Sequence, residues 1–127
     1  MLSLTLPFPL STNHLWGQAG KRKFLKKAAH EFRAKVQDAV VEAKAKFIGE
    51  RAAVFVALYP PTKRKYDADN RLKCLLDALQ HTGVIYDDEI VDTIVVVKRE
   101  PIAGGMCKVV IVSDECRKVK QEIWEDM

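Results

Sequence analysis

The spacing of apolar residues in the middle of the chain changes twice, and this change constrains the fold more than any other feature of the sequence. Ala52–Leu58 is almost wholly apolar and is followed by a Pro-Pro pair, which is typical of a buried strand that ends there. Over Asp69–Gln80 leucines recur every three or four residues, as on one face of a helix, and Gly83 lies just past its end. Ile90–Lys98 is rich in β-branched residues and predicts a second strand. A strand, a helix and a strand in succession predict an α/β fold.

The segments on either side are expected to add strands, helices and one loop. Alternating polarity predicts a strand at the start of the chain, and a repeat of three or four residues predicts a long amphipathic helix that stops before Gly49. Gly104-Gly105 predicts a turn that makes a hairpin of the last two strands. The expected elements are a strand over Leu2–Leu6, a loop over Ser11–Gly20, a helix over Arg22–Phe47, a strand over Cys107–Val112 and a short helix over Asp114–Met127. At 127 residues the chain suits one domain, in which helices pack against a small mixed β-sheet.

Positive charge is concentrated near the start of the expected long helix. The net charge of +4 favours a polyanionic partner only weakly, because many small proteins are this basic. The clustering is more informative, since five cations fall within seven residues with no acid among them: Lys21, Arg22, Lys23, Lys26 and Lys27. A solvated helix face and a DNA contact both explain such a cluster.

The cysteines and the apolar segments indicate a reduced, cytoplasmic protein. Cys74, Cys107 and Cys116 are odd in number and lack C-x-x-C spacing, so neither a disulfide framework nor a zinc site is indicated. Pro7 and Pro9 interrupt the apolar run at the N-terminus, which argues against a signal peptide. No segment approaches the ~18 apolar residues that span a bilayer, so we expect no membrane partner.

Two pairs of carboxylates flank the second expected helix and predict a metal-assisted active site. Asp67 and Asp69 stand at its start, and Asp87-Asp88 follows it in the turn expected before the next strand. Lys73 lies one helical turn after Asp69, on the same side. Carboxylates without a convergent histidine or thiolate favour Mg²⁺, for which Mn²⁺ substitutes, over zinc. We therefore expect Asp67, Asp69 and Asp88 to converge around a cation.

A basic run just before the first pair of carboxylates indicates an anionic substrate. Its members are Lys63, Arg64 and Lys65, and they would draw phosphate groups towards the carboxylates. A divalent metal ion bound to a phosphodiester activates water and stabilises the developing charge, while a lysine offsets charge on the leaving oxygen.

Simpler explanations exist for each piece of this pattern. Asp67 or Asp69 would serve equally well as a helix N-cap, and Asp69 with Lys73 as an exposed ion pair. Asp87-Asp88 is also typical of an ordinary turn. The combination of four aspartates, a lysine at the helical offset and a basic run favours a site over these separate explanations.

The order of these residues resembles the RusA family of Holliday junction resolvases, small phage and bacterial endonucleases. The resemblance covers nearly the whole chain, and the complete string is specific although any one piece would be weak. The matching motifs are the opening Leu6-Pro7-Phe8-Pro9-Leu10-Ser11-Thr12-Asn13, the basic run Lys63-Arg64-Lys65, the D-x-D-N stretch Asp67-Ala68-Asp69-Asn70, then Lys73, Asp77-Ala78-Leu79, Gly83 and Asp87-Asp88.

The resemblance implies a Mg²⁺-dependent homodimer that nicks four-way DNA junctions symmetrically, in DNA recombination and repair. It also implies that Asp67, Asp69 and Asp88 are metal-site carboxylates and that Lys73 is an accessory catalytic residue. Two other functions are compatible with the residues: a non-catalytic protein that binds branched DNA, and a small Mg²⁺-dependent nucleotide phosphohydrolase. Retention of the three aspartates with Lys73 argues against the first, and the lack of an evident base pocket argues against the second.

Overall fold

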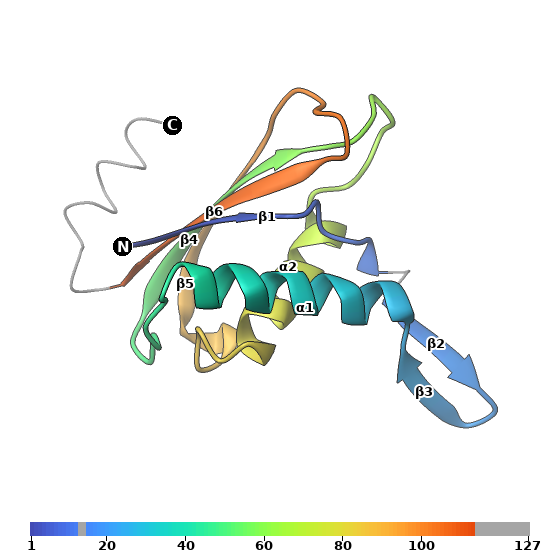
Figure 1. The fold of residues 1–127 in the computed structure, drawn as a ribbon, viewed down its shortest axis with the longest axis horizontal. Coiled ribbons are helices and arrows are strands. Elements are labelled where there is room, and N and C mark those ends of the chain that lie inside the picture. Colours follow the sequence, from blue (N-terminus) through green and yellow to red (C-terminus); the bar gives the residue numbers. More distant parts are fainter. Residues whose placement is uncertain (13–14, 114–127) are drawn as a thin grey trace.

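The protein is built on a four-stranded mixed sheet with two helices packed on one face (Figure 1). The computed structural model describes residues 1–12 and 15–113. The elements of the main sheet are β1 (Leu2–Leu6), β4 (Ala52–Tyr59), β5 (Val91–Lys98) and β6 (Met106–Ser113), in the spatial order β1-β6-β4-β5. The helices are α1 (Lys27–Glu42) and α2 (Asp69–His81), and a short 3₁₀ turn, η2 (Asp88–Ile90), precedes β5. This arrangement confirms the expected α/β class with a mixed sheet and covering helices.

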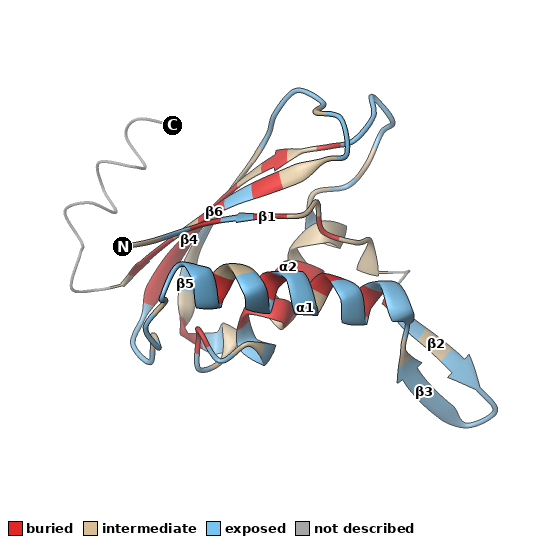
Figure 2. Cartoon of the chain, viewed as in Figure 1, coloured by how far each residue is buried: buried red, intermediate tan, exposed pale blue. Residues whose placement is uncertain are grey.

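One face of the sheet and the inner faces of both helices form the main core (Figure 2). Alternate residues of β4 point to the helices, and leucines of α2 such as Leu75 and Leu79 are fully buried against them. On α1 the buried positions are Ala29, Phe32, Val36 and Val40, spaced by three or four residues. The opposite face of β4 and β6 carries a smaller buried cluster of Ala53, Phe55 and Val112.

The first helix is shorter at both ends than the repeat in the sequence predicts. The first turn of the expected helix is instead the strand β3 (Arg22–Leu25), which pairs with β2 (Trp16–Ala19) in a two-stranded antiparallel ribbon, and α1 begins only at Lys27. The expected loop over Ser11–Gly20 was therefore wrong in its second half, because Gly20 adopts a positive φ of 62° and turns the chain back on itself. The basic cluster lies on this ribbon and the start of the helix rather than along a helical face.

At its other end α1 stops at Glu42 instead of continuing to Phe47. Lys44 takes the left-handed conformation with φ of 51°, and the two backbone bonds Ala45 N–H to Val40 O and Lys44 N–H to Val41 O close a Schellman motif. This position is usually glycine, so a lysine there gives no warning in the sequence.

The expected hairpin of the last two strands was also wrong. β5 and β6 do not pair with each other, because β4 lies between them and bonds to both. β4 runs parallel to β5, to which α2 connects it, and antiparallel to β6. The chain after β5 therefore crosses over the end of β4, where Ile102 N–H donates to Pro60 O.

Two expectations remain, for the end of the chain and for membrane-spanning segments. The predicted helix over Asp114–Met127, which includes Cys116, lies outside the part of the chain that the structure describes. Within the described part, no helix is long and apolar enough to cross a membrane.

Candidate active site

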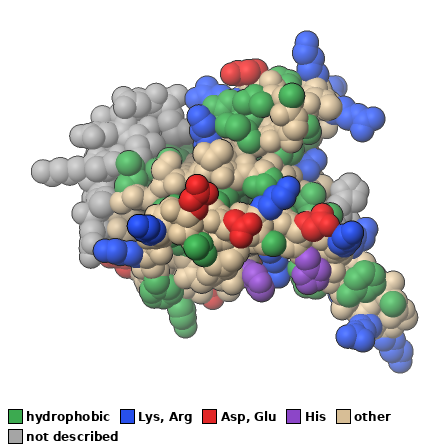
Figure 3. All heavy atoms as spheres, in the orientation of Figure 1, with side chains coloured by type: hydrophobic (Ala, Val, Ile, Leu, Met, Phe, Trp, Pro, Cys, Tyr) green, Lys and Arg blue, Asp and Glu red, His purple; other side chains and the backbone are tan. Residues whose placement is uncertain are grey.

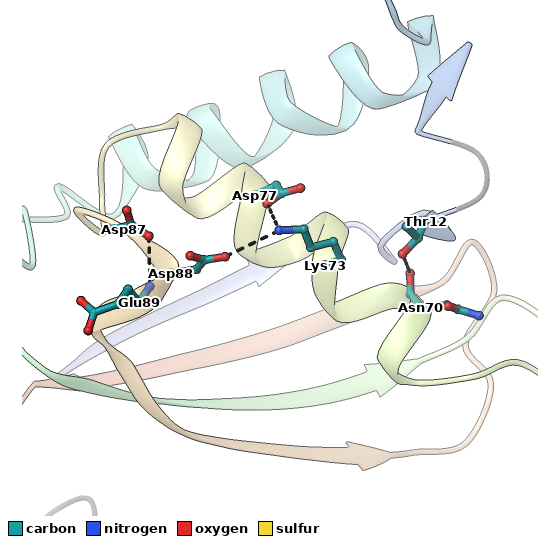
Figure 4. Close-up of polar contacts among 7 residues, drawn as sticks. All are labelled: Thr12, Asn70, Lys73, Asp77, Asp87, Asp88 and Glu89. Atoms are coloured by element: carbon teal, nitrogen blue, oxygen red, sulfur yellow. Dashed lines mark hydrogen bonds and ion pairs between the residues drawn. The ribbon is translucent and has the colours of Figure 1, made fainter. Parts of the chain in front are cut away.

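The second helix places Lys73 between two carboxylates (Figure 4). Lys73 Nζ lies 3.1 Å from Asp77 Oδ1, one turn further along α2, and 3.6 Å from Asp88 Oδ2 in the following turn. The leucine face of α2 is buried in the core. Lys73 therefore lies on the outer side of the helix, close to the turn that leads to β5. The Asp88 carboxylate was expected near the start of α2. It lies instead beside Lys73, further along the helix.

These contacts fix the charge of Lys73. Its hydrogen bond to Asp77, followed by the Coulombic attraction of Asp77 and then of Asp88, raises the pKa of Lys73 above its ordinary value. Lys73 is therefore a cation at neutral pH, a form that can offer a positive charge or a hydrogen bond but cannot accept a proton.

The neighbouring Asp87 has a structural role. Its Oδ1 accepts a hydrogen bond from Glu89 N–H at 3.1 Å and so caps η2. That bond is the largest of the causes that lower the pKa of Asp87. The turn interpretation of Asp87-Asp88 is thus correct for Asp87, while Asp88 faces Lys73.

Asp67 and Asp69 stand at the N-terminal end of the same helix, and both are exposed. Ala68 holds the N-cap position of α2, with no side-chain cap, so neither aspartate serves as the N-cap residue. Asp67 Oδ2 accepts a hydrogen bond from Asn70 Nδ2 at 3.4 Å. The ion partners of Lys73 are Asp77 and Asp88, and not Asp69 as the simpler explanation of these residues would have it.

The proline-rich opening of the chain fastens this end of α2. Thr12 Oγ1 donates to Asn70 O at 2.8 Å, and Arg71 Nη1 donates to Pro9 O at 2.9 Å. The Arg71 guanidinium also lies 5.1 Å from the centre of the Phe8 ring. These long-range contacts fix the start of the helix, and with it the positions of the two exposed aspartates.

The donors suit a hard cation by type, but the structure does not gather them. Asp67, Asp69 and Asp88 offer only carboxylate oxygens, the ligands that Mg²⁺ prefers. Over residues 1–12 and 15–113, however, no three His, Cys, Asp or Glu side chains are grouped closely enough to hold a metal ion. The sequence-predicted convergence of the three aspartates is therefore not seen in this arrangement, in which Asp88 instead contacts Lys73.

Comparison with known proteins places the chain in a family. The family described as Endodeoxyribonuclease RusA matches residues 7–112. A relative named crossover junction endodeoxyribonuclease rusA, from Enterobacteria phage HK97, is 35% identical over 101 residues, which cover 79% of this chain and 84% of the relative. The chain belongs to the RusA family. The matched range includes both pairs of carboxylates, Lys73 and the opening from Pro7 onward.

Two residues near the predicted site were given no role from the sequence. Asp77 is the nearer of the two ion partners of Lys73. Its position four residues further along the helix was enough to predict this contact. Lys98, at the end of β5, had no such signal. Its Nζ donates to Tyr66 O at 2.6 Å and lies 4.4 Å from the centre of the Tyr66 ring, so it holds the residue before Asp67.

The basic run lies beside Asp67 on the loop between β4 and α2. Lys63, Arg64 and Lys65 are all exposed. An open cavity of about 490 Å³ is lined by Arg64, Lys65, Tyr66, Asp67 and Lys98. Three cations and one carboxylate around one opening suit a phosphate group next to a carboxylate-held cation.

Proposed function

We propose that this chain is a Mg²⁺-dependent endodeoxyribonuclease that resolves four-way DNA junctions by paired nicks. The observation that carries the proposal is the family match over residues 7–112, together with the phage relative named for crossover junctions. The exposed aspartates beside a cationic cavity supply chemistry of the required kind.

In this proposal Asp67, Asp69 and Asp88 hold the divalent cation. When bound, Mg²⁺ would activate water and stabilise charge on the phosphodiester. Neither Asp67 nor Asp69 is the N-cap residue of α2, and both side chains are exposed; the one contact of Asp67, from Asn70 Nδ2, is long at 3.4 Å. Asp88 is only loosely engaged at 3.6 Å from Lys73, so its carboxylate can turn to a cation at small cost.

Lys73 has the role of a positioned charge. The shorter contact to Asp77, at 3.1 Å, would keep the ammonium in place when Asp88 turns away. Held there as a cation, Lys73 would stabilise the negative charge that develops on the phosphate or on the leaving oxygen.

The DNA would be gripped by the two basic groups. Lys63, Arg64 and Lys65 line the approach to Asp67, and the cluster from Lys21 to Lys27 lies on and beside the β2–β3 ribbon. A four-way junction must be cut in two strands, and one chain supplies one site. The proposal therefore includes a two-fold homodimer that presents both sites to one junction.

Cleavage of labelled DNA tests the function directly. The protein is incubated with a four-way junction and with plain duplex of the same sequence, with Mg²⁺ and with EDTA. We expect symmetric nicks in the junction only, and only with Mg²⁺. Cleavage of duplex at an equal rate, or release of phosphate from nucleoside triphosphates instead, would refute junction resolution.

Carboxylate variants test the site. Asp69→Asn, and separately Asp67→Asn or Asp88→Asn, should abolish cleavage and leave junction binding in EDTA unchanged or tighter, because each removes a ligand and a negative charge that faces phosphates. Asp38→Asn is the matched control, an exposed aspartate on α1. Full-rate cleavage by any of the three variants would remove that residue from the metal site.

Sedimentation equilibrium at micromolar concentration tests the assembly. We expect a species of twice 14.4 kDa. A chain that stays monomeric even on junction DNA would contradict paired incision by a dimer, even if single nicks were found.

A further inference from the structure

The ribbon of β2 and β3 projects from the body of the molecule beyond the start of α1 (Figure 1). It is largely exposed from Trp16 to Phe24, and its two strands pair only with each other. A two-residue turn, Gly20-Lys21, joins them, and Gln18 Nε2 donates to Gly20 O at 3.1 Å across this turn. From Trp16 to Phe24 the ribbon is therefore a projection that lies outside the core, while Leu25 at its base packs against it.

Each face of the ribbon carries one aromatic side chain and one cation. The register pairs Trp16 with Leu25 and Gln18 with Lys23 on one face. On the other face Phe24 is opposite Gly17 and Arg22 is opposite Ala19. Trp16 is 50% exposed and Phe24 is 46% exposed, which is unusual for such large apolar groups.

Phe24 owes its position to the missing side chain at Gly17. A Cβ built on Gly17 would lie 2.3 Å from the Phe24 ring, so only glycine lets the ring lie flat across the opposite strand. Phe24 thus stabilises the ribbon itself. Trp16 pairs with the partly buried Leu25 and does not fill a gap left by a glycine in the opposite strand.

Charge decides which partner such a ribbon suits. Lys and Arg side chains occupy its tip (Figure 3), and Lys21, Arg22 and Lys23 are followed by two more lysines at its base without an acidic residue. A second copy of this chain would bring the same cations face to face. A polyanion neutralises them and releases counterions.

The dimensions of the ribbon match a DNA major groove. A groove about 12 Å wide and about 8.5 Å deep admits a two-stranded ribbon. Each strand here has 4 residues, which at ~3.4 Å per residue gives roughly 10–14 Å of reach. The ribbon is therefore long enough to cross the groove from one wall to the other, so that the cations near its tip can reach the phosphates at the far edge.

The ribbon is also anchored next to the candidate site. Thr12, which bonds to the start of α2, is followed after three residues by Trp16, so the two lie within roughly 14 Å. DNA that passes Asp69 can continue to the ribbon without a break in contact.

We propose that the β2–β3 ribbon enters the major groove of a duplex arm of the substrate, with Trp16 against the groove wall and Arg22 and Lys23 on the phosphates. This inference rests on the proposed function for the identity of the substrate, but it concerns duplex contact and does not depend on cleavage. The ribbon holds an arm at a distance from the cut.

Binding to plain duplex in EDTA tests the inference apart from catalysis. With a duplex of about two turns (~20 bp), the double variant Arg22→Ala/Lys23→Ala should flatten the plot of log affinity against log salt by about 1.8 units, because it neutralises two fewer phosphates. Lys35→Ala/Lys46→Ala removes the same charge from exposed positions outside the ribbon and should leave the slope unchanged. Equal slopes for both double variants would overturn the proposal.

The tryptophan distinguishes groove entry from contact with phosphates alone. Trp16→Ala should weaken duplex binding by about five-fold or more, and Trp16→Phe should restore most of the affinity, since large aromatic groups at an interface carry much of its energy. Trp124→Phe leaves Trp16 as the only tryptophan, and its fluorescence should become shielded from acrylamide on duplex DNA. No shielding, together with full affinity of Trp16→Ala, would overturn groove entry.

Protection of guanine N7 from methylation reports on the major groove itself. The protein should protect a patch within one junction arm, and Trp16→Ala should lose this protection while the catalytic region of the footprint persists. If junction cleavage is absent but the arm is protected, the proposed function fails and the ribbon inference stands. If cleavage is normal and the arm is unprotected, the ribbon inference fails and the proposed function stands.

Discussion

Lys73→Ala should reduce catalysis far more than it reduces stability, and the structure gives both magnitudes. The Lys73 side chain is 55% exposed, and its two ion pairs to Asp77 and Asp88 lie at the surface. Exposed pairs are worth about 0.2–1 kcal/mol each, so their removal should lower the free energy of unfolding by no more than about 2 kcal/mol. If Lys73 stabilises the transition state, the same substitution should lower the cleavage rate by at least ~10²-fold, which corresponds to about 2.7 kcal/mol of activation free energy.

Three measurements separate these effects. Single-turnover cleavage of a four-way junction at saturating protein gives the rate, titration in EDTA gives the affinity, and urea unfolding gives the stability. Working at saturation and well below the unfolding midpoint removes both weak binding and partial unfolding from the measured rate. Lys35→Ala, which removes an exposed lysine from α1, is the matched control and should cleave at the wild-type rate.

The outcome that would refute the reasoning is a parallel decrease of rate and affinity. Lys73 would then be an ordinary phosphate contact, equal in the ground state and the transition state. Lys73→Arg refines the result, because a planar guanidinium cannot reproduce a compact ammonium held between two carboxylates and should restore little of the rate.

Three further predictions concern the support of the site and the core. Asp77→Asn should slow cleavage less than Lys73→Ala does, because it removes the negative charge of the partner at 3.1 Å while the ammonium of Lys73 remains; a rate equal to wild type would show that the charge of Asp77 does not position Lys73. Leu79→Ala, at a fully buried position of α2, should lower the free energy of unfolding by about 2–5 kcal/mol in urea, and a decrease below about 1 kcal/mol would contradict the burial. Burial raises the pKa of Cys107 to about 12, so its native thiol should resist alkylation at pH 8, as read by peptide mass spectrometry. Because the folded-state pKa lies above the unfolded value, this thiol's contribution to stability should be intact below about pH 8.5 and lost as pH rises towards 12.

The arrangement of Lys73 shows how positioning is divided between local and distant contacts. Asp77 reaches it through helical spacing alone, one turn along α2. Asp88 reaches it only because the chain turns after the helix and η2, capped by Asp87, fixes the direction of the turn. The opening segment then fixes the other end of α2 through Thr12 and Arg71, whose partners lie 58 and 62 residues away.

Local periodicity was sufficient for the elements that carry a clean apolar pattern. The strand over Ala52–Leu58 and the helix over Asp69–Gln80 could be predicted because each buries one face or both faces in the core, and that burial leaves a repeat in the sequence. The motif order likewise identified the family, and the carboxylates, the basic residues and Lys73 were all visible as candidates before any contact was known.

Tertiary structure alone decided where those candidates meet. The repeat that suggested a helix from Arg22 could not show that Gly20 would fold the same cations into a ribbon, because the repeat predicts only that Leu25 contacts the core, and Leu25 does so from the end of β3. The sequence order of β4, β5 and β6 could not show that β4 lies between the other two, because strand pairing depends on contacts between residues far apart in the chain. Asp88 and Lys98 come from separate elements after α2, and only the packing of those elements brings one to Lys73 and the other to Tyr66. A one-dimensional pattern records which face of a segment is buried; it does not record which distant residue lies against the exposed face.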